Sequence, residues 1–208
     1  RIVPLDMATI KNLADGFAPR WQIVVWIGFF TGMRPSEVLG LTWDRLDFEN
    51  QEITVDRQLS RDSKKIFADH LKTSKSYRKI PFSPYLQRLL LEHRDQHGLG
   101  PHGLILQNRS GNVWRYKDAS AMFRLIARPL GFDKGEGMHQ LRHTCASVLI
   151  KLGNNAKQIQ EWLGHESILE TMDTYGHLFP RDLHEVSERL DAYVVGQLEI
   201  QHEQRMLA

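Results

Sequence analysis

Cysteines, long apolar runs and a targeting signal are scarce or missing in this sequence. Cys145 is the only cysteine among the 208 residues, so no disulfide can form within the chain, which favours a reducing, intracellular compartment. The most apolar stretch, residues 23–30, is far shorter than the about 20 residues that a membrane-spanning helix needs. No charged start followed by an apolar segment and a small-residue cleavage site is present. We therefore expect a cytoplasmic protein without a membrane partner.

Neither sign of charge dominates the chain, because 27 Lys and Arg stand against 25 Asp and Glu, which gives a formal net charge of +2. The charges are nevertheless unevenly distributed. Between residues 57 and 79, eight Lys or Arg stand against two Asp, a balance of 8 − 2 = +6, whereas residues 181–208 carry 3 − 6 = −3. The basic segment predicts a surface that contacts phosphate; the alternative is a solvated edge hairpin protected by lysines.

The hydrophobic pattern predicts one mainly helical domain, residues 1–180, followed by a helix and tail at 181–208. Residues 1–4 look like an extended linker without a start methionine, so we expect a piece of a longer protein. Asp6 is placed to cap the first helix. Helices are expected at residues 7–17, 21–30, 35–41, 84–96, 116–128, 139–152, 156–163, 167–175 and 182–198.

A different periodicity between the third and fourth helices indicates β-structure. Residues 52–58 are rich in β-formers, and residues 66–71 and 77–82 have the pattern of a hairpin around residues 72–76. The sequence therefore predicts an α+β fold, mainly α-helical, with a small three-stranded antiparallel sheet.

Six polar residues occur along the chain in an order that suits the cutting and rejoining of a phosphodiester. A tyrosine hydroxyl can attack phosphorus, two guanidiniums can hold the non-bridging oxygens, and lysine and histidine can move protons. A phenol has a pKa of about 10, so it needs a base or positive charges nearby to lose its proton. The candidate residues are Arg34, Lys72, His139, Arg142, His165 and Tyr175.

Each of these residues also has a structural interpretation. Arg34 lies between two apolar segments, so its partner is either a phosphate or a carboxylate such as that of Glu37. Lys72, at the tip of the expected hairpin, either donates a proton to a leaving oxygen or only keeps the turn soluble. Tyr175 has polar neighbours, but most tyrosines serve in packing.

His139 and His143 are four residues apart, which is the spacing of a zinc-binding helix. The zinc hydrolase pattern also needs a glutamate directly after the first histidine, and Gln140 stands there instead. We therefore expect no metal and no cofactor. For His143 the favoured interpretation is a histidine whose hydrogen bonds are satisfied inside the core.

Taken together, the motifs resemble those of the tyrosine recombinases, or phage-type integrases. The matching pieces are Thr-Gly-Met-Arg-Pro-Ser-Glu at 31–37, Lys-Thr-Ser-Lys-Ser at 72–76, His-Gln-Leu-Arg-His-Thr at 139–144, Leu-Gly-His at 163–165 and Thr-Tyr-Gly-His at 174–177. Gln140 departs from the pattern, because an acidic residue often precedes the leucine there. The resemblance implies the tyrosine recombinase catalytic fold, with Tyr175 as nucleophile, Lys72 as general acid, and Arg34, His139, Arg142 and His165 around the scissile phosphate.

The resemblance also implies an activity and partners. The expected reaction is site-specific DNA recombination, such as the integration of a phage genome, through a 3′-phosphotyrosyl link. The expected partners are double-stranded recombination sites, accessory DNA-bending proteins and copies of the same chain, forming a tetramer on DNA from free monomers in a bacterial cytoplasm. The N-terminal DNA-binding domain of such proteins is expected to be absent here. Basic residues expected to contact DNA are Arg57, Lys64, Lys65, Lys75 and Arg78.

Two other functions remain open at this point. An enzyme that nicks and closes DNA, like a type IB topoisomerase, would use the same groups without strand exchange. A non-catalytic DNA-binding module would use the basic segment alone, although the complete set of six residues argues against it. The helix at 182–198 carries apolar residues at Leu183, Val186, Leu190 and Val194, which suit either contact with a neighbouring protomer or packing on its own domain.

Overall fold

The computed structural model describes residues 2–62, 64–71, 73–132 and 137–206, without the side chains of 201–203, 205 and 206. The chain forms two compact units, Arg1–Leu178 and Phe179–Ala208. In the described part of the chain, no helix combines the length and the apolar character needed to cross a membrane.

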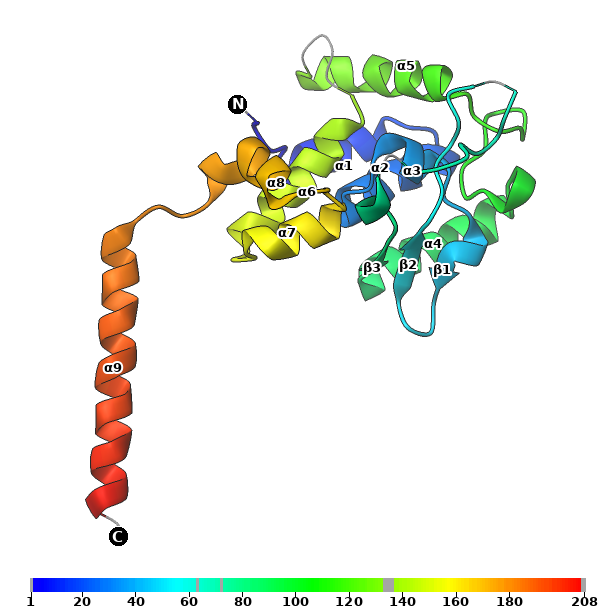
Figure 1. The fold of residues 1–208 in the computed structure, drawn as a ribbon. Coiled ribbons are helices and arrows are strands. Elements are labelled where there is room, and N and C mark those ends of the chain that lie inside the picture. Colours follow the sequence, from blue (N-terminus) through cyan, green and yellow to red (C-terminus); the bar gives the residue numbers. More distant parts are fainter. Residues whose placement is uncertain (1, 63, 72, 133–136, 207–208) are drawn as a thin grey trace. The chain divides into compact units, whose positions relative to one another are not determined.

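The first three helices of the larger unit are α1 (Met7–Asp15), α2 (Pro19–Thr31) and α3 (Pro35–Leu39). As predicted, Asp6 caps α1, since its Oδ1 accepts a hydrogen bond of 2.7 Å from the backbone of Thr9. Helix α2 packs against α1, α4 and α6 (Figure 1). A helix with neighbours on several sides is apolar on most of its surface, as α2 is.

The small antiparallel sheet has the strand order β1 (Leu46–Asp47), β2 (Glu52–Val55), β3 (Arg78–Pro81). Ile53 in the middle strand pairs with Leu46 on one side and with Ile80 on the other, so three apolar side chains face the core together. The prediction of three antiparallel strands is confirmed.

One predicted strand is wrong. Residues 66–71 do not pair with β3; the segment makes only an isolated bridge, Leu59↔Phe67, and β1 takes the third place in the sheet. The backbone of this segment is taken up by residues 58–60 instead, because Ser60 N donates to Ile66 O at 2.8 Å and Ala68 N donates to Gln58 O at 3.0 Å. The expected hairpin around residues 72–76 is wrong for the same reason, and Ser74–Ser76 forms a 3₁₀ turn that leads into β3.

The other predicted helices are confirmed within a few residues. They are α4 (Pro84–His97), α5 (Tyr116–Ala127), α6 (His139–Lys151), α7 (Ala156–Leu163) and α8 (Ile168–Tyr175). Further 3₁₀ turns lie at Trp43–Arg45, Pro101–Gly103, Arg128–Leu130 and Gly176–Leu178.

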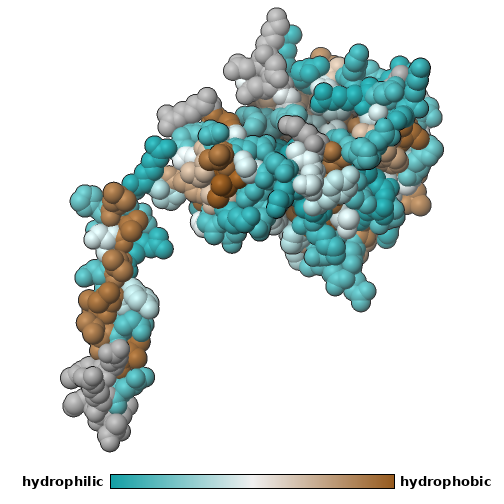
Figure 2. Space-filling view, in the orientation of Figure 1, coloured by the Kyte–Doolittle hydropathy of each residue, from teal (hydrophilic) through white to brown (hydrophobic). Residues whose placement is uncertain are grey.

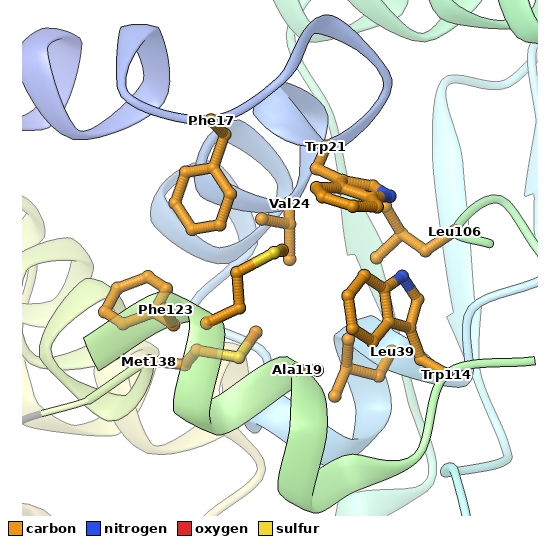
Figure 3. Close-up of a pocket in the computed structure, with 10 residues that line it drawn as sticks. Phe17, Trp21, Val24, Leu39, Leu106, Trp114, Ala119, Phe123 and Met138 are labelled. Atoms are coloured by element: carbon orange, nitrogen blue, oxygen red, sulfur yellow. The ribbon is translucent and has the colours of Figure 1, made fainter. Parts of the chain in front are cut away.

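A small cavity of about 20 Å³ lies in the apolar core, beneath α5 (Figure 3). It is lined by aromatic and aliphatic side chains, and the indole of Trp21 turns its Nε1 away to the carbonyl of Gln107, 2.6 Å distant. This volume holds a water molecule at most, so the cavity is a packing defect and the chemistry lies elsewhere. Its lining includes Phe17, Trp21, Val24, Leu39, Leu106, Trp114, Phe123 and Met138.

The smaller unit consists mainly of helix α9 (Leu183–Met206), which extends eight residues beyond the predicted end at 198 (Figure 1). Its large apolar side chains are exposed, and they form a brown band along the helix in Figure 2. The exposed residues include Leu183, Val186, Leu190, Tyr193, Val194 and Leu198.

Candidate active site

Two glycines allow the segments of the candidate site to meet. Gly32 ends α2 with a left-handed backbone (φ 60°), and a Cβ there would lie 2.7 Å from a side-chain atom of Leu163. Gly164 ends α7 in the same way (φ 67°), and its Cβ would lie 2.8 Å from the carbonyl oxygen of Lys75. Any other residue would push α7 away from α2 and from the turn before β3.

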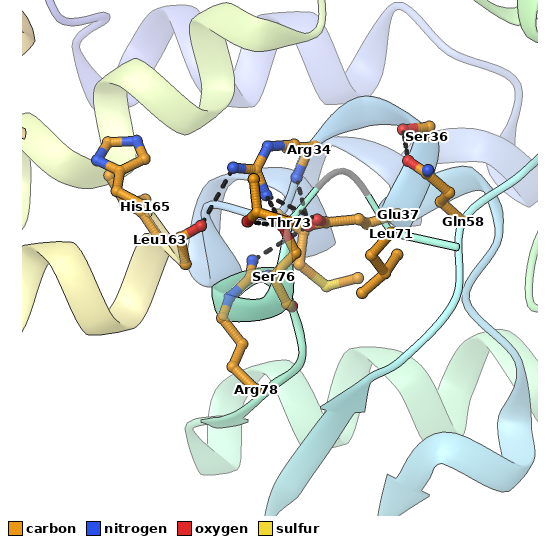
Figure 4. Close-up of polar contacts among 12 residues, drawn as sticks. Arg34, Ser36, Glu37, Gln58, Leu71, Thr73, Ser76, Arg78, Leu163 and His165 are labelled. Carbon is orange, nitrogen blue, oxygen red and sulfur yellow. Dashed lines mark hydrogen bonds and ion pairs between the residues drawn. The ribbon is translucent and has the colours of Figure 1, made fainter. Parts of the chain in front are cut away.

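Arg34 lies between α2 and α3, and its guanidinium connects three segments (Figure 4). Nη1 donates to Glu37 Oε1 at 3.1 Å and to Ser76 Oγ at 3.0 Å, while Nη2 donates to the carbonyl of Gly164 at 3.1 Å. The side chain retains 13% of its exposure. The ion pair with Glu37 that the sequence offered as an alternative is therefore present, and part of the guanidinium still faces outward.

Arg142 lies on α6 and is only 4% exposed. Its Nη1 donates to the carbonyl of Gly32 at 2.7 Å and to that of Leu163 at 2.9 Å. Burial, together with the nearby Arg34 and Arg78, lowers the pKa of Arg142 to about 10, so the group is still charged at neutral pH.

Glu37 is the carboxylate shared by this cluster, and it is 1% exposed. Arg34 and Arg78 approach it from two sides in Figure 4, each at 3.1 Å. Burial alone would raise the pKa of Glu37, but the two guanidiniums outweigh it and hold that pKa below its ordinary value. With Arg142 nearby, this buried region holds three guanidiniums and one carboxylate, so it carries 3 − 1 = +2 and favours an anion.

Tyr175, the last residue of α8, lies beside this positive region and is 1% exposed. Its hydroxyl is 2.9 Å from Nδ1 of His143 on α6, and its ring lies parallel to that of His165, with centroids 6.3 Å apart. Burial raises the pKa of Tyr175 to about 12, although Arg142 opposes the shift.

His165 and His139 are both poor proton acceptors here. Burial, and then Arg142 and Arg34, lower the pKa of His165 to about 3, and its Nδ1 is 2.8 Å from Thr171 Oγ1. His139 is exposed at the start of α6, but desolvation and then Arg142 lower its pKa to about 4. Both imidazoles are therefore neutral at pH 7 and can act as hydrogen-bond donors.

Lys72 lies outside the described residues. The segment that follows it is nevertheless part of the site, because Thr73 Oγ1 and Ser76 Oγ lie 3.0 Å apart and Ser76 accepts from Arg34. The structure thus brings five of the six candidates to the junction of α2, α6, α7 and α8.

Two clefts adjoin the site. The first, of about 660 Å³, includes Arg34 and His139, and across it Arg61 lies over the ring of Tyr116, 4.7 Å from its centroid. The second, of about 460 Å³, includes His165 and Gly164 and is rich in cations, which are Lys75, Arg78, Lys79 and Lys157.

The basic residues expected to contact DNA differ in their surroundings. Arg78 is buried against Glu37, which gives it a structural contact. Arg57 pairs with Asp56 at 3.1 Å and Lys65 with Asp69 at 2.6 Å. Lys64 and Lys75 are exposed, and Lys75 lines the second cleft.

Sequence reasoning missed the contact of His143 with Tyr175 and the cleft residues Arg61 and Lys157. The spacing of His143 was visible, but its partner lies 32 residues away, so only the packing of α8 on α6 reveals the pair. Among the described residues, no group of three or more His, Cys, Asp or Glu is placed to hold a metal ion.

Known proteins are similar to this chain in sequence. Residues 7–181 match the model of the phage integrase family. The ICEBs1 integrase of Bacillus subtilis (strain 168) is 28% identical over 172 residues, which cover 79% of this chain and 47% of that protein. A tyrosine recombinase XerC-like protein of Caldanaerobacter subterraneus subsp. tengcongensis is 28% identical over 207 residues, which cover 89% of this chain and 52% of the relative.

Solved structures agree in fold. The Tn1549 transposon integrase in complex with transposon right end DNA superimposes with a TM-score of 0.76 at 25% identity, over 92% of this chain and 66% of that one. The catalytic domain of bacteriophage HP1 integrase gives 0.60 at 24% identity, over 90% of this chain and 95% of that one. The fold is that of the tyrosine recombinase catalytic domain. The chain belongs to the phage integrase family, and it spans about half the length of the curated relatives it matches.

Proposed function

We propose that the chain is the catalytic domain of a site-specific recombinase that cleaves and rejoins DNA through a 3′-phosphotyrosyl link. The observation that carries this proposal is the buried excess of +2 beside Tyr175, produced by Arg34, Arg78 and Arg142 around Glu37. A phosphodiester brings one negative charge, and the developing charge of its transition state is stabilised by donors already in place.

The reaction proposed is a transesterification. Tyr175 Oη bonds to phosphorus in line as the bond from phosphorus to the 5′ oxygen breaks, and a 5′ hydroxyl of the partner duplex later reverses the step. One phosphodiester is exchanged for another of similar energy, so no nucleotide hydrolysis is required. Arg34 and Arg142 hold the non-bridging oxygens, His139 and His165 donate hydrogen bonds to them, and Lys72 gives a proton to the leaving 5′ oxygen.

The DNA backbone is proposed to cross the site from one cleft to the other. The two clefts adjoin the site through Arg34 and His165 respectively, and the second is lined by four Lys or Arg against Glu161. Phosphate contacts of this kind position the duplex without reading its sequence. Recognition of a particular site then falls to other parts of the protein, as the length of the relatives suggests.

The proposed partners are double-stranded recombination sites, further copies of the chain as a tetramer on DNA, and accessory DNA-bending proteins in a bacterial cytoplasm. The exposed apolar residues of α9 support contact between protomers, because an unburied stripe of this kind favours association. Bacterial integrases and Xer recombinases among the relatives support the reaction class and the compartment.

A covalent adduct tests the reaction. Full-length protein incubated with a nicked recombination site, whose short 5′ fragment is lost after cleavage, is expected to accumulate a protein–DNA adduct. Tyr175→Phe is expected to abolish it while DNA binding remains. An adduct that survives this change contradicts the nucleophile assignment, and relaxation of supercoils without any strand exchange would favour the topoisomerase-like alternative.

The role of Lys72 has a separate test. A substrate with a 5′-bridging sulfur has a better leaving group and needs no general acid. Lys72→Ala is expected to cleave ordinary DNA about 10²- to 10⁴-fold more slowly, and to recover with the sulfur substrate. Failure to recover would show that the lysine acts in another way.

A further inference from the structure

The imidazole of His143 is hydrogen-bonded to the hydroxyl of Tyr175. Its Nδ1 lies 2.9 Å from Tyr175 Oη, and the two ring centroids are 5.8 Å apart. The histidine follows Arg142 on α6 and is half-buried, whereas the tyrosine ends α8. The packing of these two helices therefore places an imidazole nitrogen directly on the atom that attacks phosphorus.

The buried phenol needs such a neighbour. With its pKa raised to about 12 by burial, Tyr175 is ionised in only a very small fraction of molecules at pH 7. Attack by so small a fraction would limit the reaction severely, so the proton must leave as the new bond forms. A base for this step must lie within about 2.6–3.2 Å of the hydroxyl, or reach it through one water.

The other two histidines fit this task less well. The ring of His165 lies parallel to that of Tyr175, at an angle of 12°, and its Nδ1 is engaged with Thr171. Its Nε2 lies 3.7 Å from Glu170 Oε1, so both nitrogens of His165 have partners other than the hydroxyl. His139 is exposed at the opening of the first cleft, where it lies with Arg34. Their positions suit contacts with the phosphate.

We propose that His143 is the general base that takes the proton of Tyr175, an assignment that rests on the proposed function. As Oη bonds to phosphorus and the bond to the 5′ oxygen breaks, the phenolic proton passes to Nδ1 of a neutral imidazole. The leaving oxygen takes its own proton from a separate acid, Lys72. In the reverse step the imidazolium returns its proton to Oη as the phosphotyrosyl bond breaks.

Two substitutions separate proton transfer from packing. His143→Asn leaves a hydrogen-bonding group close to the position of Nδ1 but cannot take up a proton. The full-length protein with this change is expected to bind the nicked site normally and form the adduct about 10²- to 10⁴-fold more slowly. His102→Asn is the matched control, since that histidine is exposed in the turn Pro101–Gly103, outside both clefts, and is expected to react at the wild-type rate.

Chemical rescue distinguishes a base from a structural contact. His143→Ala opens space beside Tyr175, and added imidazole is expected to restore adduct formation in proportion to its concentration. Religation of a preformed adduct is expected to slow by a similar factor in His143→Asn, because the base of one direction is the acid of the other. Absence of rescue in a His143→Ala protein that still binds the nicked site overturns the proposal.

Failure of the His143 assignment and failure of the recombinase reaction itself give different experimental results. Wild-type protein that binds DNA and forms no adduct contradicts the recombinase reaction itself. Wild-type protein that forms the adduct, with His143→Asn equally fast, contradicts only the role of His143. A ¹⁵N resonance of His143 that does not change in Tyr175→Phe would overturn the contact without any measurement of activity.

Discussion

Two regions, the charged cluster around Arg142 and helix α9, depart in opposite ways from the usual pattern in which apolar side chains are buried and charged ones are exposed. In the first, charged groups are buried: Arg142 is 4% exposed and Glu37 is 1% exposed. In the second, large apolar groups such as Leu190 and Val194 are exposed. Each departure is costly for an isolated chain, and a different kind of partner would offset each cost. An anion would offset the buried excess of positive charge, whereas an apolar protein surface would cover the exposed stripe.

The comparison predicts that the two regions fail in different ways when they are altered. Changes in the charged cluster are expected to affect the chemical step or the stability of the larger unit. Changes in α9 are expected to affect assembly alone.

Arg142→Ala is expected to lower the rate of cleavage most among these changes, by at least about 10²- to 10³-fold, because one set of phosphate donors is lost. Arg142→Lys keeps the charge but loses the planar fork, and is expected to recover only part of the rate. Single-turnover adduct formation measures both. Arg88→Ala, on the exposed face of α4, is the control. Equal rates in all four proteins would contradict a role for the buried cations in the reaction.

Glu37→Gln tests how much the carboxylate of Glu37 stabilises the fold by offsetting the repulsion among the three nearby guanidiniums. Removal of this carboxylate leaves three guanidiniums without a counter-charge, which is expected to cost about 3–5 kcal/mol in urea unfolding. The pKa of Glu37 is lowered in the folded state, so its contribution is present above the unfolded value and is lost as pH falls through the folded value. The difference from wild type should therefore shrink in acid. Phosphate or a DNA oligonucleotide should stabilise the variant more than the wild type.

A paired change in α9, Leu190→Asp with Val194→Asp, is expected to leave the unfolding of the larger unit within about 0.5 kcal/mol of wild type. Higher-order complexes on DNA should disappear, because the apolar stripe is interrupted twice. Sedimentation of protein–DNA mixtures measures this, with Glu188→Gln on the same helix as the control. Unchanged assembly would contradict a role for the exposed apolar residues of α9 in contacts between protomers.

Lys157→Ala, in the second cleft, should have the smallest effect. One phosphate contact fewer is expected to reduce the slope of log affinity against log salt by about 1, with little change in the cleavage rate at saturating DNA. Titrations at several salt concentrations measure the slope. A large fall in the cleavage rate would instead place Lys157 in the chemistry.

The sequence predicted most of the fold because its signals are local. Asp6 caps α1, Gly32 and Gly164 end α2 and α7, and helical periodicity gave the remaining helices. The sheet was less predictable, because pairing depends on distant partners. Leu46 pairs with Ile53 in a strand of two residues, which carries almost no periodic signal, whereas residues 66–71 looked like a strand and form only a bridge.

The candidate site was predictable to the extent that motifs carry it. Arg34, Arg142 and Tyr175 were found from their order along the chain, but the sequence left open whether Arg34 pairs with Glu37 or with phosphate. The structure supplies the pair and leaves part of the guanidinium exposed. His143 could not be assigned from its spacing, since a position four residues from His139 says nothing about what α8 brings to it.

Gly164 has a consequence for how this protein tolerates change. Its carbonyl accepts a hydrogen bond from Arg34, and a Cβ would lie 2.8 Å from Lys75 O and 2.9 Å from Arg78 Cδ. One peptide unit thus joins the turn between α2 and α3 to the end of α7 and to the turn before β3, although it takes no part in any bond that is made or broken. A deep mutational scan selecting for recombination should therefore find that Gly164, a residue without a side chain, is as intolerant of change as Tyr175, the proposed nucleophile.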